Sequence, residues 1–218
     1  MTAGVSNCAL VLGAGGGLGP AELSVPDASE LTLVWVKTEY DELSMGGVVD
    51  QLQEHASNIG RVCICHGLLH SETIWPEKRL EDINATSMHE IFQSNTVVPA
   101  LWLKLLFKVL KGQEPCVVAT MSARVGSIGD NRMGRWHSYR ASKAALNMVL
   151  QNMAIEYARR VKNVKLIAFH PGTTDTGLSK PYQGAVPSGK LFSPAFVAAR
   201  LAQLMDNADL DGQLSYVD

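Results

Sequence analysis

Long runs of like charge are missing from this sequence. Charged residues make up only 18% of the 218 residues, and the formal net charge is −2. A protein that binds nucleic acid usually carries a basic stripe or patch. The even balance of charge therefore argues against a nucleic-acid partner.

The sequence also has no hydrophobic run of the length that a bilayer requires. Its most apolar helical stretch, Val97–Leu110, is interrupted by Lys104 and Lys108 and falls short of the ~20 residues of a membrane span. The N-terminus lacks a basic segment followed by a long apolar run, which is the pattern of a secretory signal peptide. We therefore expect a cytoplasmic protein without a membrane partner.

Cysteine is scarce, and its spacing argues against both a disulfide framework and a metal site. No C-x-x-C pair occurs, and no carboxylate is suitably placed beside the two histidines that follow the central cysteines, His66 and His70. Free cysteines in apolar runs are usually buried and reduced. We expect this for all four and predict no metal: Cys8, Cys63, Cys65 and Cys116.

What the sequence does contain is a regular alternation of short apolar runs and longer helical patterns. Apolar residues make up 46%, which together with the length fits a single domain over residues 1–218. The predicted strands are Cys8–Leu12, Leu31–Val36, Val62–Cys65, Cys116–Met121, Val164–Phe169 and Gln213–Val217. The predicted helices are Ser44–Ser57, Met88–Leu110, Ser138–Val161 and Pro194–Asp206. Apolar strands separated by helices indicate an α/β fold with a Rossmann-like, doubly wound parallel sheet in three layers, α/β/α.

Two loops follow predicted strands at the sheet edge where such folds bind ligands. The first, "LGAGGGLG" at Leu12–Gly19, lets backbone N–H groups approach a pyrophosphate closely, although a simple glycine-rich turn remains the alternative. The second, Pro171–Pro194, is too long for an ordinary turn. We expect this second loop to cover substrate, with three side chains as its walls: Leu178, Tyr182 and Phe192.

The stretch "YRASKAALN" places Tyr139 and Lys143 four residues apart, on one face of a predicted helix. A phenol with a pKa of about 10 exchanges protons poorly at neutral pH, and a nearby ammonium lowers that pKa. The pair is therefore a candidate for acid–base chemistry. Taken alone, however, it is more often an ordinary surface pair.

Several motifs in order change this balance. They are Gly13-x-x-x-Gly17-x-Gly19, Asn95 in "FQSNTVVPAL", Ser122 after "CVVATM", Tyr139-x-x-x-Lys143, and "HPGTTDT" at 170–176. With them the chain resembles the short-chain dehydrogenase/reductase family over nearly its whole length. "MSARVGSIGDNRMGRWHSYRASKAALN" and "HPGTTDTGLSKPYQGAVPSGKLF" are similar to the C-factor-like subgroup, whose relatives include sniffer-type carbonyl reductases.

The resemblance implies a NAD(P)-dependent oxidoreductase that interconverts a small carbonyl compound and an alcohol. Tyr139 would act as the general acid, and Lys143 would lower its pKa and bind the nicotinamide ribose. Asn95 would hold a water molecule, and Ser122 would stand near the family's catalytic serine. The implied cofactor-binding residues are Gly13, Gly17, Leu18, Gly19, Gly67, Tyr139, Lys143, Pro171, Gly172, Thr174 and Thr176. The family also implies a homodimer or homotetramer.

The site departs from the family pattern in two places. The family usually has two serines after the fifth strand, and the second polarises the carbonyl, whereas this chain reads Ser122-Ala123. Ser122 could substitute only if its hydroxyl turns inward, and Ser127 is another candidate. The asparagines expected before Gly67 are replaced by residues 64–66. These changes leave open an alternative function, a nucleotide-binding signalling or regulatory protein with weak or no turnover.

The third departure is a shortage of residues after the glycine loop. Only Pro20–Glu30 precede Leu31–Val36, which we assign to the family's third strand, so the first crossover helix and the second strand have no counterpart. Either a segment is absent from the sequence given, or the protein has a real deletion and a damaged cofactor site. If Leu31–Val36 is instead the second strand, Lys37 stands where the family selects its cofactor and favours NADP. We expect NAD(P), with NADP slightly favoured.

Overall fold

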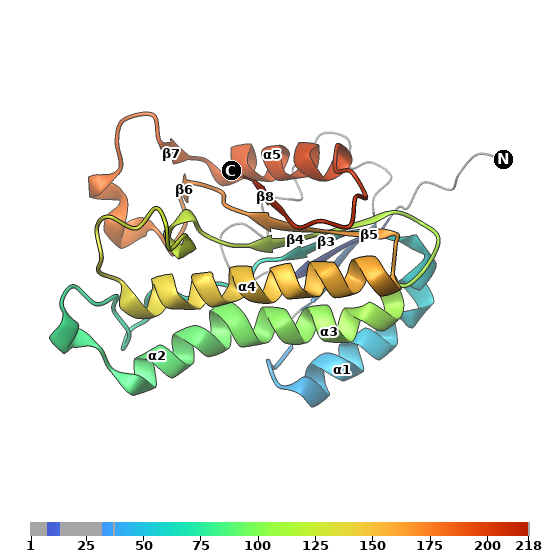
Figure 1. The fold of residues 1–218 in the computed structure, drawn as a ribbon, viewed down its shortest axis with the longest axis horizontal. Helices are drawn as coiled ribbons and strands as arrows, with labels where there is room; N and C mark the ends of the chain where they lie inside the picture. Colours follow the sequence, from blue (N-terminus) through green and yellow to red (C-terminus); the bar gives the residue numbers. More distant parts are fainter. Residues whose placement is uncertain (1–7, 14–31, 37, 218) are drawn as a thin grey trace.

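A six-stranded parallel sheet organises the chain in the computed structural model, which describes residues 8–13, 32–36 and 38–217. The strand order is β2-β1-β3-β4-β5-β8 (Figure 1). Each neighbouring pair is parallel. The strands are β1 (Cys8–Leu12), β2 (Thr32–Val36), β3 (Ile59–Ile64), β4 (Cys116–Met121), β5 (Val164–Phe169) and β8 (Ser215–Val217).

The strands are apolar on both faces because both faces are covered. Their register aligns residues in rows across the sheet, and one row joins Leu10, Val62, Val118 and Leu166. These four side chains are buried in one core cluster, whereas Val11 and other alternate residues of the strands belong to a second cluster on the opposite face. Continuous burial is what a sheet between two layers requires.

Helices cover both faces of the sheet (Figure 1). The first cluster contains residues of α1 (Glu42–Gln51), α3 (Val98–Leu110) and α4 (His137–Arg160), which lie together below the sheet in that view. The second cluster contains residues of α5 (Pro194–Asp206), which lies on the other side. The structure therefore confirms the predicted α/β fold with a doubly wound parallel sheet.

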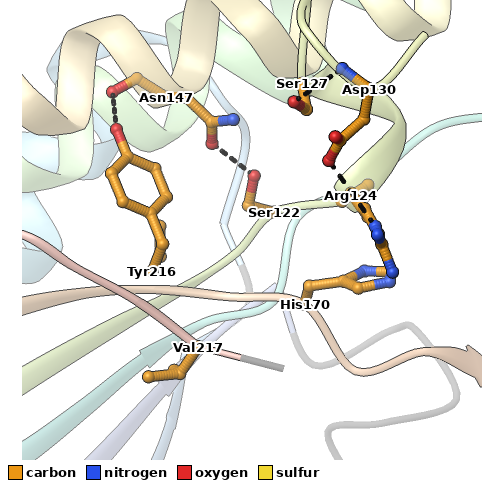
Figure 2. A pocket seen from close by; sticks show the side chains of 10 residues that line it. Ser122, Arg124, Ser127, Asp130, Asn147, His170, Tyr216 and Val217 are labelled. Carbon is orange, nitrogen blue, oxygen red and sulfur yellow. Dashed lines mark hydrogen bonds and ion pairs between the residues drawn. The ribbon is translucent and has the colours of Figure 1, made fainter.

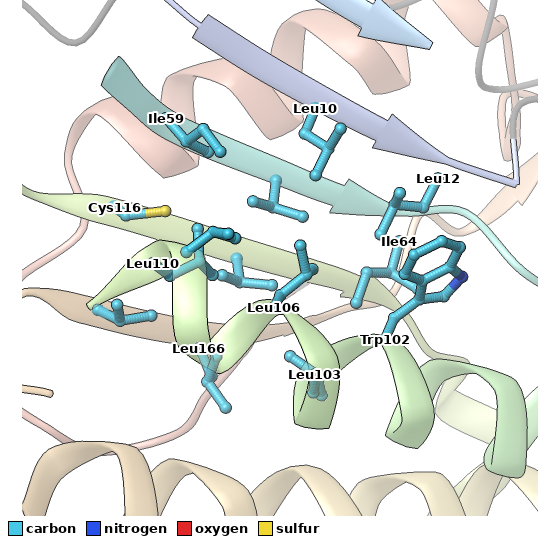
Figure 3. Packing of buried hydrophobic residues seen from close by; sticks show 14 of the residues in the cluster. Leu10, Leu12, Ile59, Ile64, Trp102, Leu103, Leu106, Leu110, Cys116 and Leu166 are labelled. Carbon is cyan, nitrogen blue, oxygen red and sulfur yellow. The ribbon is translucent and has the colours of Figure 1, made fainter. Parts of the chain in front are cut away.

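The core of the first face forms where α3 packs on the sheet. Figure 3 shows Trp102, Leu103 and Leu106 of α3 against strand residues such as Leu10 and Ile64. All five side chains are essentially inaccessible to solvent. Burial of each contributes roughly 1.5–3 kcal/mol relative to exposure, so this contact is a major source of stability.

The starts of α1 and α5 are capped by side chains, whereas the start of α4 is not. Asp41 accepts the N–H groups of Leu43 and Ser44 at α1, and Ser193 accepts that of Phe196 at α5. Such caps satisfy backbone donors that the first helical turn leaves without partners. The N-cap residue of α4, Trp136, makes no such bond with its own side chain. A residue from another segment does this instead, as described below.

The position of β2 differs from the assignment made on the sequence. It pairs directly with β1, which is the place of the second strand in a Rossmann sheet of order 3-2-1-4-5-6. Its connection resembles that of the third strand, because α1 leads from β2 across β1 to β3. One strand thus takes the place of two in the part of the chain that the structure describes. Residues 14–31, where the missing crossover helix was expected, lie outside the described residues.

Two predicted elements are divided in the structure. The expected helix Met88–Leu110 consists of α2 (Ala85–Phe92), one π-helical turn (Gln93–Val97) and α3. The expected loop Pro171–Pro194 contains two short strands, β6 (Thr173–Thr174) and β7 (Leu191–Phe192), which pair with each other. Between them lies a 3₁₀ turn, Lys180–Ala185. The loop is therefore a small substructure that stands over the edge of the sheet.

Candidate active site

The carboxyl ends of the parallel strands meet at one edge of the sheet, and the candidate residues gather there. Three backbone hydrogen bonds continue the sheet into the loops: Cys65 N to Leu12 O, Ser122 N to Phe169 O, and His170 N to Val217 O, each 2.8 Å. They hold the segments that follow β3, β4 and β5 against the ends of β1, β5 and β8. Open α/β sheets bind their ligands at this edge.

A cavity of about 510 Å³ lies at this edge. Its size suits a cofactor fragment and a small substrate. The candidate residues that line it are Gly67, Ser122, Tyr139, Lys143, Pro171, Gly172, Thr174 and Thr176. The structure thus brings together most of the predicted site. Gly17, Leu18 and Gly19 lie outside the described residues, and Asn95 lies behind the cavity wall.

Tyr139 and Lys143 begin α4 and are both buried, with 7% and 2% of their surfaces exposed. The Lys143 ammonium lies 5.9 Å from the centroid of the Tyr139 ring. It donates a hydrogen bond of 2.8 Å to the carbonyl of Met121, the last residue of β4. This burial argues against an ordinary surface pair, because burial of an ammonium is costly unless it is compensated.

Burial shifts the pKa values of these two groups in opposite directions. It lowers the pKa of Lys143 to about 8 and raises the pKa of Tyr139 to about 12. Both shifts disfavour the charged form, as desolvation does in general. Burial is the cause of the raised pKa of Tyr139. The phenol is therefore protonated at neutral pH.

Asn95 occupies the π-helical turn between α2 and α3. Pro99, four residues later, has no N–H to donate toward the Asn95 carbonyl, which explains the wider turn. The fully buried Asn95 side chain accepts from Leu68 N (2.6 Å) and donates to Leu68 O (2.9 Å) and Ser142 Oγ (3.0 Å). Both amide N–H bonds are thus used to tie the loop after Gly67 to the first turn of α4. These bonds give Asn95 a structural role at this junction.

Ser122 does not turn its hydroxyl toward Tyr139. Figure 2 shows its side chain pointing to Asn147, whose Oδ1 accepts its hydrogen bond at 2.5 Å. Both residues belong to a second cavity of about 520 Å³, which also contains Ser127. The Ser127 hydroxyl accepts from Asp130 N in that cavity. Neither serine has a hydrogen bond to Tyr139 in the structure, and the neighbouring Ala123, which lines both cavities, has no hydroxyl.

His66 closes the cavity beside the first strand. Its Nε2 accepts a 3.0 Å hydrogen bond from the indole N–H of Trp102. Burial, with a smaller effect of the Lys143 charge, lowers the His66 pKa to about 4. The imidazole is therefore neutral at pH 7. Gly13 has φ +78°, and a Cβ atom there would lie 3.0 Å from the imidazole ring, so this place requires glycine for two reasons.

The segment that follows β5 forms the opposite wall. Gly172 has φ +69°, and a Cβ atom there would lie 2.7 Å from the ring of Phe192. Phe192 stacks on Phe196 of α5 and is not among the residues that line the cavity, so its predicted role as a substrate wall was wrong. Thr174 Oγ1 lies 3.4 Å from the carbonyl of Pro171. Leu178 and Tyr182 line the cavity as expected.

Sequence reasoning missed the residues that hold the start of α4. Gly134, Arg135 and Trp136 have φ values of 61°, 59° and 52°, a left-handed stretch that costs a non-glycine residue roughly 1–2 kcal/mol. Glu77, which is buried, accepts the Trp136 N–H at its carbonyl (2.7 Å). Its carboxylate accepts the N–H (3.2 Å) and the hydroxyl of Ser138. The missing N-cap side chain before Tyr139 was the signal that another residue must cap this helix.

Two further classes of site find no support in the described residues. In the part of the chain that the structure describes, no group of three or more His, Cys, Asp or Glu side chains is arranged to hold a metal ion. Within the same residues, no helix has the length and hydropathy of a membrane span.

A family model described as "short chain dehydrogenase" matches residues 40–185, which is more than half of the chain. The chain belongs to the short-chain dehydrogenase family. The matched region includes Asn95, Tyr139 and Lys143. The match begins after the glycine loop, so Gly13, Gly17, Leu18 and Gly19 lie outside it.

Two relatives match parts of the chain. A 1-hydroxy-2-glutathionyl-2-methyl-3-butene dehydrogenase of Rhodococcus sp. (strain AD45) is 34% identical over 52% of this chain and 47% of its own length. The C-signal protein of Myxococcus xanthus is 29% identical over 47% of this chain and 60% of its own length. The match spans about half the length of these relatives. It confirms the expected kinship with C-factor-like proteins.

Solved structures of the family have the same fold. The carbonyl reductase Sniffer of D. melanogaster has a TM-score of 0.76 at 18% identity and is covered to 96%, as is this chain. An NADPH-bound carbonyl reductase from chicken fatty liver has a TM-score of 0.73 at 19% identity, with 96% of this chain and 91% of that chain covered. At these identities the likeness concerns the fold.

Proposed function

We propose that this protein is an NADP-dependent oxidoreductase that reduces a carbonyl compound, with Tyr139 as the proton donor. The observation that carries the proposal is the burial of Tyr139 and Lys143 side by side in one cavity at the carboxyl edge of the sheet. A structural pair of this kind belongs on the surface, where neither group loses its hydration. Burial of both groups beside an open cavity serves chemistry better than stability.

The described residues fit a nicotinamide cofactor. Glycine stands at the carboxyl ends of β1 and β3 and after β5, at Gly13, Gly67 and Gly172. A Cβ atom at Gly67 would stand 3.9 Å from the Lys143 ammonium, so the absence of a side chain keeps that approach open. Gly67, Lys143, Gly172 and Thr174 would hold the nicotinamide end, and Gly13 would admit the rest of the cofactor beside β1. A bound nicotinamide would supply the hydride.

Within this site Tyr139 would hold the carbonyl oxygen and transfer its hydroxyl proton to it. The raised pKa keeps the phenol protonated before reaction, and the Lys143 ammonium stabilises the phenolate that remains. Lys143 keeps its orientation through the Met121 carbonyl. Asn95 ties the Leu68 loop to α4 and so fixes the distance between the two walls.

Preference for NADP over NAD rests on β2. This strand lies next to β1, and Lys37 follows it in the sequence. The residue that ends this strand selects the cofactor in Rossmann folds, and a cation suits the 2′-phosphate of NADP. The NADPH-bound neighbour supports the same choice. Titration should show tighter binding of NADPH than of NADH, and a Lys37→Glu variant should lose this preference. Equal affinity of the unmodified protein for both cofactors would contradict the assignment.

The decisive test of the function is a Tyr139→Phe variant. Phenylalanine keeps the ring and its packing against Trp136 but removes the proton. We expect NADPH binding within about threefold of the unmodified protein and a loss of at least 10²-fold in kcat for carbonyl reduction. Turnover at the original rate would show that Tyr139 is not the donor.

A second candidate function is favoured by Ala123. Without the polarising serine a nucleotide-binding protein could act in signalling with little turnover, and one relative bears the name C-signal. A panel of carbonyl compounds separates the two functions. Tight NADPH binding with no consumption of NADPH across the panel favours the signalling function, and measurable reduction of any member favours the enzyme.

We further propose that the protein assembles into a homodimer or homotetramer. α4 leaves Met148 and Ile155 exposed, by 62% and 41%, although it packs tightly on the sheet with its other face. Apolar side chains on a long exposed helix suit a self-complementary interface. Sedimentation equilibrium should give a mass at least twice that of the chain, and Met148→Glu should lower it.

A further inference from the structure

The cavity has a wall of aromatic rings, of which the proposed reaction requires only Tyr139. Trp136, Tyr139 and Tyr182, here called the aromatic wall, all line it. The Trp136 ring meets Tyr139 edge to face at 6.2 Å between centroids and Tyr182 at 5.1 Å. Tyr182 is in turn backed by His70 at 5.8 Å. These distances are those of favourable aromatic pairs.

Trp136 stands between the proton donor and the segment that covers the cavity. Tyr139 lies in the first turn of α4, and Tyr182 lies in the 3₁₀ turn between β6 and β7. A substrate whose carbonyl oxygen reaches the Tyr139 hydroxyl can therefore place its substituent against Trp136 and Tyr182. The Tyr182 hydroxyl is buried and has no hydrogen-bond partner among the described residues. A bound molecule that accepts a hydrogen bond from this hydroxyl would remove the cost of burying it without a partner.

The backbone holds Trp136 in place at the expense of strain. Its φ of 52° and ψ of 45° are left-handed, which a residue with a large side chain adopts only when its surroundings require it. The N–H of Trp136 donates to the Glu77 carbonyl. The Trp136 carbonyl accepts from the N–H of Arg140 (2.9 Å). The Glu77 carboxylate binds Ser138, two residues on. Glu77 thus fixes both ends of the turn that presents the indole ring.

The side chains of the remaining lining limit which substrates the cavity suits. No Asp, Glu, Asn or Gln side chain lines this cavity in the described part of the chain. A sugar or polyol needs several such groups, and a cationic substrate needs a carboxylate. Apolar side chains such as Leu69, Val125 and Leu178 extend the aromatic wall, and the lining also contains lysine and histidine side chains: His66, Lys143, His170 and Lys190.

We propose that the cavity binds carbonyl compounds that carry a flat aromatic ring, with Trp136 as the specificity-determining residue and Glu77 as its positioning residue. The proposal rests on the proposed function for the placement of the carbonyl at Tyr139, but the recognition of the ring does not depend on turnover. The aromatic wall contacts the ring, and Glu77 acts through the turn at Trp136.

The test compares two ketones of equal size, acetophenone and cyclohexyl methyl ketone, which differ in whether the ring is aromatic. Calorimetric titration of the full chain with NADP⁺ present should give a Kd for acetophenone about threefold to tenfold lower, as one aromatic contact predicts. Glucose is the probe for a polyol site. Equal affinity for the two ketones, or tighter binding of glucose, overturns the proposal.

Two variants and a control assign the effect to Trp136. Trp136→Leu should abolish the preference, and Trp136→Phe, which keeps a ring, should retain part of it even if the leucine variant fails to fold. Trp75→Leu is the matched control, because Trp75 is 60% exposed and does not line the cavity. It should bind both ketones like the unmodified protein. A preference that survives in Trp136→Leu overturns the assignment.

Glu77 is tested by the same ratio of Kd values and by rescue. Glu77→Ala should lower the preference for acetophenone and change the near-ultraviolet circular dichroism of the indole. Glu77→Gln can still accept from Ser138 and should restore both. A variant that only loses thermal stability, with the ratio unchanged, overturns the positioning role.

Binding and turnover together separate this inference from the proposed function. Selective binding of acetophenone without NADPH consumption refutes the reductase and leaves the ring site standing. Reduction of both ketones with equal kcat/KM and equal Kd refutes the ring site and leaves the reductase standing.

Discussion

Replacement of Ala123 by serine should raise the activity of this protein. Ala123 stands directly after Ser122, at the place where the family has its second serine, and it lines the same cavity as Tyr139 and Lys143. Its backbone is extended, with φ −154° and ψ 139°, which serine adopts without strain. The Ser122 hydroxyl cannot serve instead while it donates to Asn147. The substitution therefore adds a donor that the site lacks.

The size of the effect follows from what one donor contributes to a transition state. Loss of one preorganised donor to a developing oxyanion costs about 10²–10³ in kcat, or about 3–4 kcal/mol. A donor added to a scaffold that did not evolve around it should recover the lower end of this range, roughly 10²-fold. The gain should appear in kcat with KM nearly unchanged, because the bond strengthens as charge develops on the oxygen.

The assay is the initial rate of NADPH consumption with acetophenone for three proteins. Ala123→Ser should be faster than the unmodified chain, and Ser122→Ala, the matched control, should change kcat by less than about threefold. Unchanged kcat in a folded Ala123→Ser variant would show that a hydroxyl at this position does not stabilise the transition state. A large loss in Ser122→Ala would show instead that Ser122 leaves Asn147 and serves as the donor.

Three further predictions concern stability and pH. Lys143→Met should raise the free energy of unfolding at pH 7 by about 2 kcal/mol. The shift of the lysine pKa from 10.5 to about 8 destabilises the folded protein by roughly 3 kcal/mol, and methionine removes this cost. The loss of the hydrogen bond to the Met121 carbonyl offsets about 1 kcal/mol of the gain. Folded Lys143 loses its proton at a lower pH than unfolded Lys143, so the stability advantage of the variant should shrink as the pH rises from about 8 to 10.5. Urea unfolding of both proteins at pH 7 and pH 10 tests whether the advantage shrinks. His66→Gln should lose less stability in acid than the unmodified protein. In the unmodified protein the unfolded state takes up a proton on His66 below pH 6.5, whereas the folded state does so only near pH 4, so stability falls as the pH drops from 6.5 to 4. An equal loss of stability in both proteins between these pH values would contradict the lowered pKa of His66. Gly172→Ala should destabilise by more than Gly189→Ala, because both have positive φ but only Gly172 adds a contact of 2.7 Å with Phe192; equal losses in urea would show that the contact is relieved without cost.

The fold was predictable because each strand carries its own signal. Cys116–Met121 and Val164–Phe169 have the predicted bounds, since apolar runs bounded by turn residues leave little choice. The π-helical turn at Asn95 was not predicted. Its cause, Pro99 without an N–H four residues later, acts through backbone geometry that periodicity does not report. The short strands β6 and β7 were missed because two residues each are too few for a pattern.

The residues of the candidate site that belong to a local sequence motif were predictable. Those whose role depends on a contact with a distant part of the sequence were not. Tyr139 and Lys143 share a helix face by spacing alone, and the structure brings both to the cavity. The direction of the Ser122 hydroxyl depends on Asn147, 25 residues away in the sequence. The role of Glu77 depends on a contact across 61 residues with Ser138. Neither contact follows from local sequence, because both arise when loops from different strands meet.

The central claim is that this site transfers hydride to a carbonyl and that Tyr139 supplies the proton. Its most direct test is a reaction of the full-length protein with acetophenone and NADPH deuterated at the transferable position of the nicotinamide. The alcohol product should carry deuterium at the former carbonyl carbon, and Tyr139→Phe should form at least 10²-fold less of it. An alcohol without deuterium, or equal yields from the two proteins, would contradict the central claim.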